Sequence, residues 1–186
     1  ALQSKLMSYC LHVNSGELSC HHKYYHDNIY GFPCKNDNEI FGRLVLEINQ
    51  AGLSWDIILK KEKTIKKAYK NYSFNEIAKF DQYDIKRILN DKGAIRMRGK
   101  VIAIIHNAKK VVSLSEKHNS FKNYLDKHHT LSLSGWVSLF KKEFKFVGNE
   151  ICKEFLTSIG YLKGAHKKSC PIYKKVIKQK PMWNNN

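Results

Sequence analysis

Potential metal ligands stand near both ends of this chain, and they constrain its fold more than any other feature. Near the start, His26 lies in the run Tyr-His-Asp-Asn at 25–28, and near the end His166 precedes Cys170. Cys10 adds a second thiol. Zinc accepts histidine nitrogen and cysteine sulfur in a tetrahedral array, and a closed set of four protein ligands is structural. If these residues share one ion, the two ends of the chain must meet.

The spacing alone leaves other ligand sets open. Cys10 and His26 are far apart in the sequence, and Cys20, His21 and His22 compete for the same role. The chain has five cysteines, an odd number, and its N-terminus lacks the apolar region of a secretory signal. This favours reduced thiols, some of them on a metal, over a disulfide framework. We therefore expect an untargeted, cytoplasmic protein.

The formal net charge of +17 indicates a polyanionic partner, most often nucleic acid. The alternative is a lysine-rich composition that reflects genomic base bias and gives only solvated faces. No apolar run is long enough to span a bilayer, so we expect no membrane partner. The length of 186 residues fits one domain over residues 1–186, with 170–186 as a flexible basic tail.

Apolar spacing and capping residues predict an all-α fold, and no alternating strand pattern or internal repeat is present. Asn38 and Ser54 are expected to cap two successive helices, with Gly52 between them. Further helices are predicted after a capping box at Ser73 and Glu76, over 84–89, over 100–112, from Ser132 or Ser134, and after Gly148.

Glu47 lies at the edge of an apolar helical stripe, in the stretch Leu-Glu-Ile-Asn-Gln-Ala-Gly-Leu-Ser-Trp at 46–55. Spacing alone favours a surface ion pair with Arg43, one turn earlier, worth about 0.2–0.5 kcal/mol. The alternative is a carboxylate facing a semi-buried pocket with Trp55 as a wall. There it would accept hydrogen bonds from a ring amine and attract a cationic base.

A break between two predicted helices runs from Lys92 to Lys100 and contains Gly93 and Gly99. Such a hairpin can present backbone N–H groups and a helix N-terminus to a phosphate, with charge from nearby cations. The cations here are Arg96, Arg98 and Lys100. The alternative is an ordinary turn with solvated arginines.

Taken together, the motifs resemble those of the bacterial 3-methyladenine DNA glycosylase I family. Residues 25–33, Tyr-His-Asp-Asn-Ile-Tyr-Gly-Phe-Pro, are similar to its YHDxEWGxP signature, and residues 46–55 to its LExxQAGLSW. The hairpin at 95–100, Phe-Lys-Phe-Val-Gly at 144–148 and the pair His166 and Cys170 follow in the family's order. The resemblance covers most of the chain, from about Cys10 to Cys170.

The resemblance implies an all-helical, two-lobed glycosylase of the helix-hairpin-helix superfamily, with a structural zinc ion that joins the N- and C-termini. The implied ligands are His26, His166, Cys170 and Cys10, with Cys20 as a rival for the first position. Glu47 would be the catalytic carboxylate, Trp55 and Tyr25 the stacking residues, and Tyr30 and His22 further substrate-binding positions. Gly93, Arg96, Arg98 and Lys100 would bind DNA.

The implied function is DNA repair. The enzyme would flip a 3-methyladenine nucleotide out of alkylated double-stranded DNA and hydrolyse its N-glycosidic bond, as a monomer, in the bacterial cytoplasm. The chain departs from the family pattern at several positions. His22 replaces a pocket tyrosine, Tyr30 a signature tryptophan and Lys153 a common tyrosine, and the region 126–143 is shortened. The alternatives are a non-catalytic damaged-DNA-binding protein and a zinc-stabilised RNA-binding module.

Overall fold

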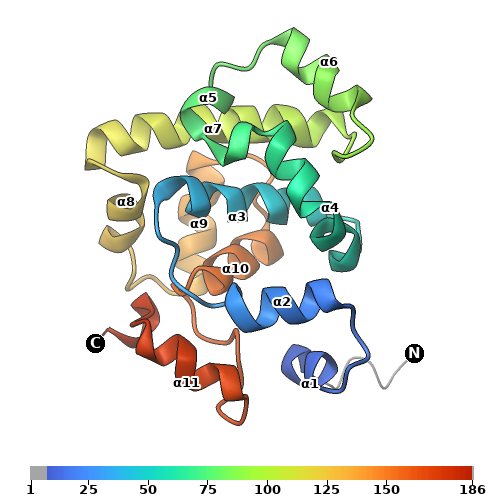
Figure 1. Cartoon of the computed structure of the whole chain (residues 1–186). Coiled ribbons are helices and arrows are strands. Elements are labelled where there is room, and N and C mark those ends of the chain that lie inside the picture. The colour runs from blue at the N-terminus through green and yellow to red at the C-terminus, as the bar shows by residue number, and fades with distance from the viewer. Residues whose placement is uncertain (1–7, 186) are drawn as a thin grey trace. The chain divides into compact units, whose positions relative to one another are not determined.

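The computed structural model describes residues 8–185, and every regular element among them is a helix (Figure 1). The α-helices are α1 (Tyr9–Asn14), α2 (Cys20–Asn28), α3 (Asp37–Gln50), α4 (Trp55–Ala68), α5 (Phe74–Ile77), α6 (Gln82–Asn90), α7 (Arg98–His118), α8 (Phe121–Lys127), α9 (Leu133–Glu143), α10 (Asn149–Ser158) and α11 (Pro171–Lys178). Two short 3-10 helices are η2 (Lys70–Tyr72) and η3 (Met182–Asn184). The all-α prediction is confirmed.

The chain divides into two compact units. The central unit is Cys34–Phe155, and the terminal unit combines Ala1–Pro33 with Leu156–Asn186. One boundary lies between Pro33 and Cys34, before α3, and the other falls inside α10, between Phe155 and Leu156. The terminal unit therefore contains all the residues that were predicted to bind metal, and the central unit contains Glu47, Trp55 and the hairpin.

The central unit is organised around α7, which packs against α3, α5, α6 and α8 (Figure 1). Val101, Ile104, Ala108 and Val111 recur at helical spacing on α7 and are fully buried. This apolar stripe explains why the helix packs at the centre of the unit. Helix α7 runs on to His118, six residues beyond the predicted end, because apolar residues such as Leu114 continue the buried face.

The start of α3 differs from the prediction. Asn36, and not Asn38, is the N-cap, because its side-chain oxygen accepts a hydrogen bond from the backbone N–H of Glu39 at 3.0 Å. At the other end, Gly52 has a φ of +76°, a conformation that glycine adopts without steric cost. Ser54 then caps α4 as predicted. This tight turn places Trp55 at the first position of α4.

Two other expectations were wrong in detail. Ser73 precedes α5 but makes no side-chain capping bond, so the predicted capping box does not form. Residues 171–178 form α11, where a flexible tail was expected. Ile172 and Val176 lie one turn apart on α11, and both pack in a cluster with Cys10 and Cys170. That burial orders the segment. Among the described residues, no helix has the length and apolarity needed to cross a membrane.

Candidate metal cluster, buried carboxylate and basic hairpin

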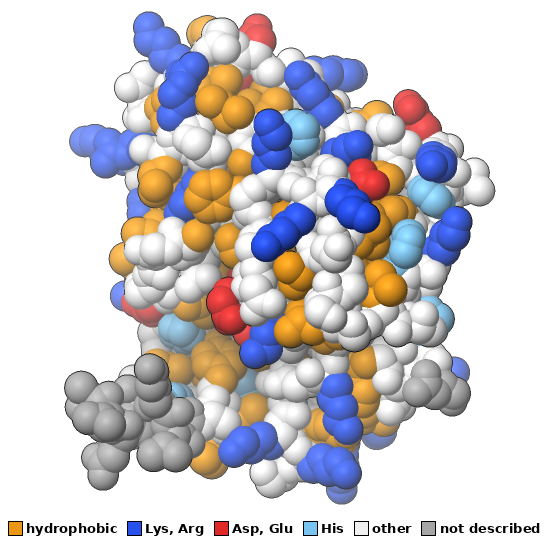
Figure 2. All heavy atoms as spheres, turned by 180° about the vertical axis from the view of Figure 1, so that it is seen from behind, with side chains coloured by type: hydrophobic (Ala, Val, Ile, Leu, Met, Phe, Trp, Pro, Cys, Tyr) orange, Lys and Arg blue, Asp and Glu red, His pale blue; other side chains and the backbone are white. Residues whose placement is uncertain are grey.

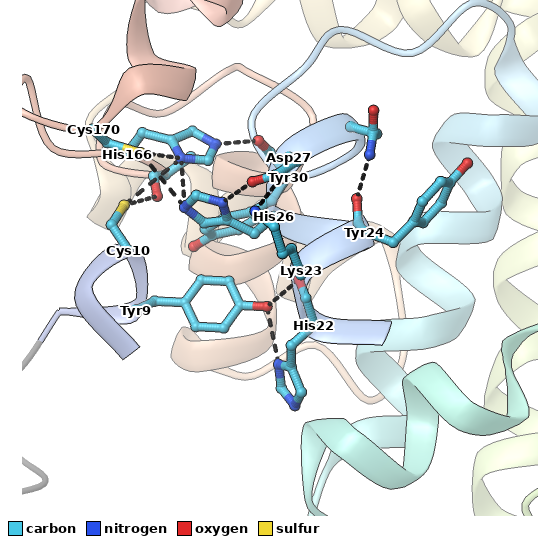
Figure 3. A network of polar contacts seen from close by, with 12 residues as sticks. Tyr9, Cys10, His22, Lys23, Tyr24, His26, Asp27, Tyr30, His166 and Cys170 are labelled. Carbon is cyan, nitrogen blue, oxygen red and sulfur yellow. Dashed lines mark hydrogen bonds and ion pairs between the residues drawn. The ribbon is translucent and has the colours of Figure 1, made fainter. Parts of the chain in front are cut away.

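Four buried side chains meet in the terminal unit: Cys10 of α1, His26 of α2, His166, and Cys170 at the start of α11 (Figure 3). One ligand atom from each lies within 4.8 Å of all the others. The Nε2 atom of His26 is 3.2 Å from Nδ1 of His166 and 3.7 Å from Sγ of Cys170. Sγ of Cys10 is 3.7 Å from Nδ1 of His166. The cluster thus combines residues from both ends of the chain.

Neighbouring acceptors fix the orientation of both imidazoles. Nδ1 of His26 lies 2.7 Å from a carboxylate oxygen of Asp27, and Nε2 of His166 lies 2.7 Å from the carbonyl oxygen of Tyr30. Carboxylates and carbonyls accept hydrogen bonds, so each of these nitrogens carries the proton. Nε2 of His26 and Nδ1 of His166 therefore direct lone pairs into the cluster.

These two lone pairs face each other and cannot form a hydrogen bond between them. A cation placed among the four atoms would satisfy both nitrogens and both sulfurs. Tetrahedral zinc, with bonds of about 2.0–2.1 Å to nitrogen and about 2.3 Å to sulfur, places its ligand atoms about 3.3–3.8 Å apart. The observed separations of 3.2, 3.7 and 3.8 Å fit this geometry. Hydrogen bonds to the far nitrogens of the histidines are the usual support of such a site.

Gly31 allows the close approach that brings His166 into the cluster. Its φ is +84°, and a Cβ atom there would lie 2.6 Å from the Cβ of Ala165. Its N–H donates to the carbonyl of Ser158 at 2.9 Å. Any larger residue at position 31 would push the 165–166 segment away from α2.

Aromatic rings surround the cluster. Tyr30 stacks on Tyr25 with ring centroids 5.5 Å apart, and Tyr9 contacts His26 and Tyr30 edge to face. His22 is buried, and its Nδ1 lies 3.0 Å from the hydroxyl of Tyr9. Tyr25, Tyr30 and His22, all predicted substrate-binding residues, therefore lie together beside the cluster.

The structure separates the two candidate first ligands. Cys10 is buried in the cluster, whereas Cys20 is exposed at the start of α2 and is not part of it. Asp27 and Tyr9 were missed by the sequence reasoning. The adjacency of His26 and Asp27 was a usable signal, because a carboxylate often orients a metal-binding histidine. No pattern in the sequence indicated Tyr9.

Glu47 is buried, with 5% of its surface exposed, which excludes the solvated surface ion pair with Arg43. Burial and the negative charge of Glu154 raise its pKa to about 8, against the smaller opposing effect of Arg43. A cation or a hydrogen-bond donor placed beside this buried carboxyl would stabilise its ionised form.

Lys100 does not have the environment that was predicted for it. Its side chain is 1% exposed, and Nζ donates to the carbonyl oxygens of Asn49 at 2.7 Å and Ala51 at 2.6 Å. These carbonyls end α3, where a cation stabilises the helix dipole. Its ammonium is therefore occupied inside the central unit, and a direct phosphate contact by Lys100 is excluded. It instead holds the turn that leads to Trp55.

The hairpin between α6 and α7 is anchored on α4. The Thr64 hydroxyl donates to the carbonyl of Gly93 at 2.7 Å, and Nζ of Lys61 donates to the carbonyl of Lys92 at 2.5 Å. A Cβ atom on Gly93 would lie 2.8 Å from the Cβ of Thr64. Packing on α4 is thus a sufficient reason for glycine at position 93.

Arg96 and Arg98 are exposed on the hairpin, in contrast to Lys100. A groove of about 540 Å³ lies between the hairpin and α4. Its lining combines the apolar side chains of Leu53 and Ile57 with the cationic Lys61, Lys92 and Arg96. The hairpin therefore offers an apolar floor bordered by positive charge, which suits a polyanion.

Comparisons with known proteins agree with this arrangement. A sequence model of the Methyladenine glycosylase family matches residues 17–134. DNA-3-methyladenine glycosylase 1 of Escherichia coli is 31% identical over 168 residues, which cover 80% of this chain and 89% of that protein.

Solved structures show the same similarity in three dimensions. A structure that describes 3-methyladenine recognition by 3-methyladenine DNA glycosylase I of Staphylococcus aureus is similar with a TM-score of 0.79 and 25% identity. The similarity covers 89% of this chain and 97% of that one. A tyrosine-to-phenylalanine variant of 3-methyladenine DNA glycosylase I, in complex with 3-methyladenine, gives a TM-score of 0.78 at 26% identity over the same shares of the two chains.

Proposed function

Because the chain belongs to the methyladenine glycosylase family, we propose that it is a DNA repair glycosylase that releases 3-methyladenine from alkylated DNA. The relatives are named for this activity, and a related structure holds 3-methyladenine. The single observation in this chain that carries the proposal is the buried carboxyl of Glu47, whose pKa is raised to about 8. It lies on the helix that leads directly to Trp55.

The reaction needs little acid catalysis. Adenine alkylated at N3 carries a positive charge, so the base is already a good leaving group. The enzyme must extrude the nucleotide from the duplex and stabilise the departing base, while water adds to the sugar. Ionised Glu47 would accept a hydrogen bond from the base edge and attract its positive charge. Trp55 would stack on the ring, and Tyr25, His22 and Tyr30 of the terminal unit stay predicted substrate-binding residues.

A structural zinc ion is the proposed cofactor, held by Cys10, His26, His166 and Cys170. The support is the set of four converging ligand atoms and the two oriented imidazoles. All four positions of a tetrahedral ion would be filled by protein, which leaves no site for water or substrate. The ion would therefore stabilise the terminal unit and take no part in the reaction.

The proposed DNA contact is the helix-hairpin-helix formed by α6, the turn at 91–97, and α7. Exposed Arg96 and Arg98 and the N-terminal N–H groups of α7 would bind phosphates without reading the base sequence. The support is the high positive charge of the chain and the anchoring of the turn on α4. Such contacts position a strand while the pocket selects the base.

A base-release assay on methylated double-stranded DNA, with the products identified by chromatography, tests the proposal. The wild-type protein should release 3-methyladenine, and Glu47→Gln should release it about ten- to a hundredfold more slowly. DNA binding by both proteins without any base release would identify a damaged-DNA-binding protein instead. Preference for RNA over DNA, unaffected by Glu47→Gln, would identify an RNA-binding module.

A further inference from the structure

Phe146 combines an unfavourable backbone conformation with an exposed aromatic ring. Its φ is +62°, in the left-handed region that residues with a Cβ atom avoid. Its side chain is 43% exposed, so burial of the ring offsets little of this strain. Strained residues that the surrounding structure holds in place are common at ligand-binding sites.

A buried asparagine holds the backbone beside Phe146. Asn107 of α7 is fully buried, donates through Nδ2 to the carbonyl of Lys145 at 2.9 Å, and accepts from the N–H of Lys145 at 2.7 Å. Phe144 and Val147 are buried on either side. The segment is therefore fixed at three points, and Lys145 and Phe146 project from it into solvent.

The neighbouring face of α7 is basic and partly apolar. One face of this helix carries three residues at intervals of four: Arg98, Ile102 and His106. Ile102 is 43% exposed. Burial and the positive charges of Lys145, Lys110 and Lys109 lower the pKa of His106, which shows that these cations lie around it. Lys110 also pairs with Glu143, with its Nζ 3.1 Å from a carboxylate oxygen.

Cations alone do not identify a binding surface on this molecule. Figure 2 shows Lys and Arg side chains dispersed over one whole face, with few acidic ones. An exposed aromatic ring among cations is more specific, because single-stranded DNA is bound by rings that stack on bases and by cations that contact phosphates.

We propose that Arg98, Ile102, His106, Lys145 and Phe146 form a second DNA-contact surface, which binds unpaired nucleotides exposed where the damaged one is extruded. Phe146 stacks on a base, and the cations contact the phosphates of the same strand. The inference rests on the proposed glycosylase function, because extruding a nucleotide leaves the base opposite to it unpaired. The surface continues the hairpin through Arg98, the first residue of α7.

Phe146→Gly is the decisive variant, because glycine adopts a φ of +62° without strain while the ring is lost. Affinity for a single-stranded oligonucleotide should fall roughly five- to a hundredfold, with a melting temperature equal to or above that of the wild type. Phe146→Trp, which keeps an aromatic ring, should bind the oligonucleotide with an affinity close to that of the wild type. Asn119→Gly is the matched control, since Asn119 has a φ of +67° at the other end of α7, and its affinity should not change.

The side chain of His106 reports directly on DNA binding at this surface. Its pKa, measured by NMR titration, should rise when an undamaged oligonucleotide binds, because phosphates offset the charge of the lysines around it. Wild-type affinity in Phe146→Gly, or a His106 titration that DNA leaves unchanged, would overturn the proposal. Binding to undamaged DNA does not require excision. Loss of binding in Phe146→Gly would therefore support the surface even if the wild-type protein released no base.

Discussion

At the scale of single residues, Glu47 shows how burial prepares a group for one ligand. Its pKa of about 8 means that the carboxyl is mostly protonated at neutral pH in the free protein. A cationic base at this position would favour the ionised form and lower that pKa again. The same desolvation that destabilises the free carboxylate therefore strengthens its interaction with a positively charged ligand.

The activity prediction concerns this ionisation. We expect kcat/KM for 3-methyladenine release to rise with pH towards about pH 8, because the carboxylate is the form that attracts the base. Glu47→Gln should lose about ten- to a hundredfold in rate, the equivalent of one charge-assisted hydrogen bond. Its pH profile should also be flat in this range. Normal excision by the variant would place the pocket elsewhere.

Protein stability should respond to pH in the opposite direction. The folded-state pKa of Glu47 is raised above its ordinary value of 4.5, so its contribution is fully present below about pH 4.5 and is lost as the pH rises to about 8. The melting temperature of Glu47→Gln, measured against that of the wild type, should therefore increase across this range. A constant difference from pH 4.5 to pH 8 would show that the carboxyl titrates normally.

At the scale of structural elements, the start of α7 assigns different roles to cations that are close in sequence. Arg96 and Arg98 are exposed, while Lys100 is buried and bonds the end of α3. The hairpin is thus attached to the turn that precedes Trp55. In the proposed function, Arg96 and Arg98 would contact phosphate, while Lys100 supports the turn before Trp55.

Two sets of variants separate these roles. Lys100→Met should lower the free energy of unfolding by about 1–3 kcal/mol, because two buried carbonyls lose their donor. It should leave the salt dependence of DNA binding unchanged. Arg96→Ala and Arg98→Ala should each reduce the salt slope by about one and leave stability unchanged. Chemical denaturation and binding titrations at several salt concentrations measure both quantities. A reduced salt slope in Lys100→Met would return this residue to the phosphate interface.

At the scale of the whole molecule, the four-residue cluster ties the N-terminal helices to the C-terminal one. Cys10 and Cys170 also belong to the same small apolar cluster as Ile172 and Val176. A bound metal ion would therefore act as a cross-link between segments at opposite ends of the sequence. If the proposed zinc ion is bound, the stability of the terminal unit depends on that ion.

Metal removal tests this dependence. Chelation should lower the melting temperature and release about one zinc ion per chain, because binding free energy contributes to folding. Cys170→Ser should have the same effect, whereas Cys20→Ser should retain both the metal and the stability. Elemental analysis and thermal denaturation provide the two readouts. Purified protein without zinc but with full stability would contradict the metal site.

The helical class, the candidate metal ligands, the candidate carboxylate and the candidate hairpin could all be predicted from the amino-acid sequence. These follow from apolar spacing and from short motifs whose chemistry is local. Residues such as Ser54 and Gly52 also specify their own turns, because capping and left-handed φ values depend on adjacent atoms.

The different environments of residues that look alike in the sequence came from the three-dimensional fold. It separated Cys10 from Cys20 and buried Lys100 while exposing Arg96 and Arg98. Glu47 is buried in the fold, and residues 171–178 form the helix α11. The side chain of Asn107 holds the backbone next to the strained residue Phe146. Burial and long-range hydrogen bonds depend on segments far apart in the sequence, so no local pattern reports them.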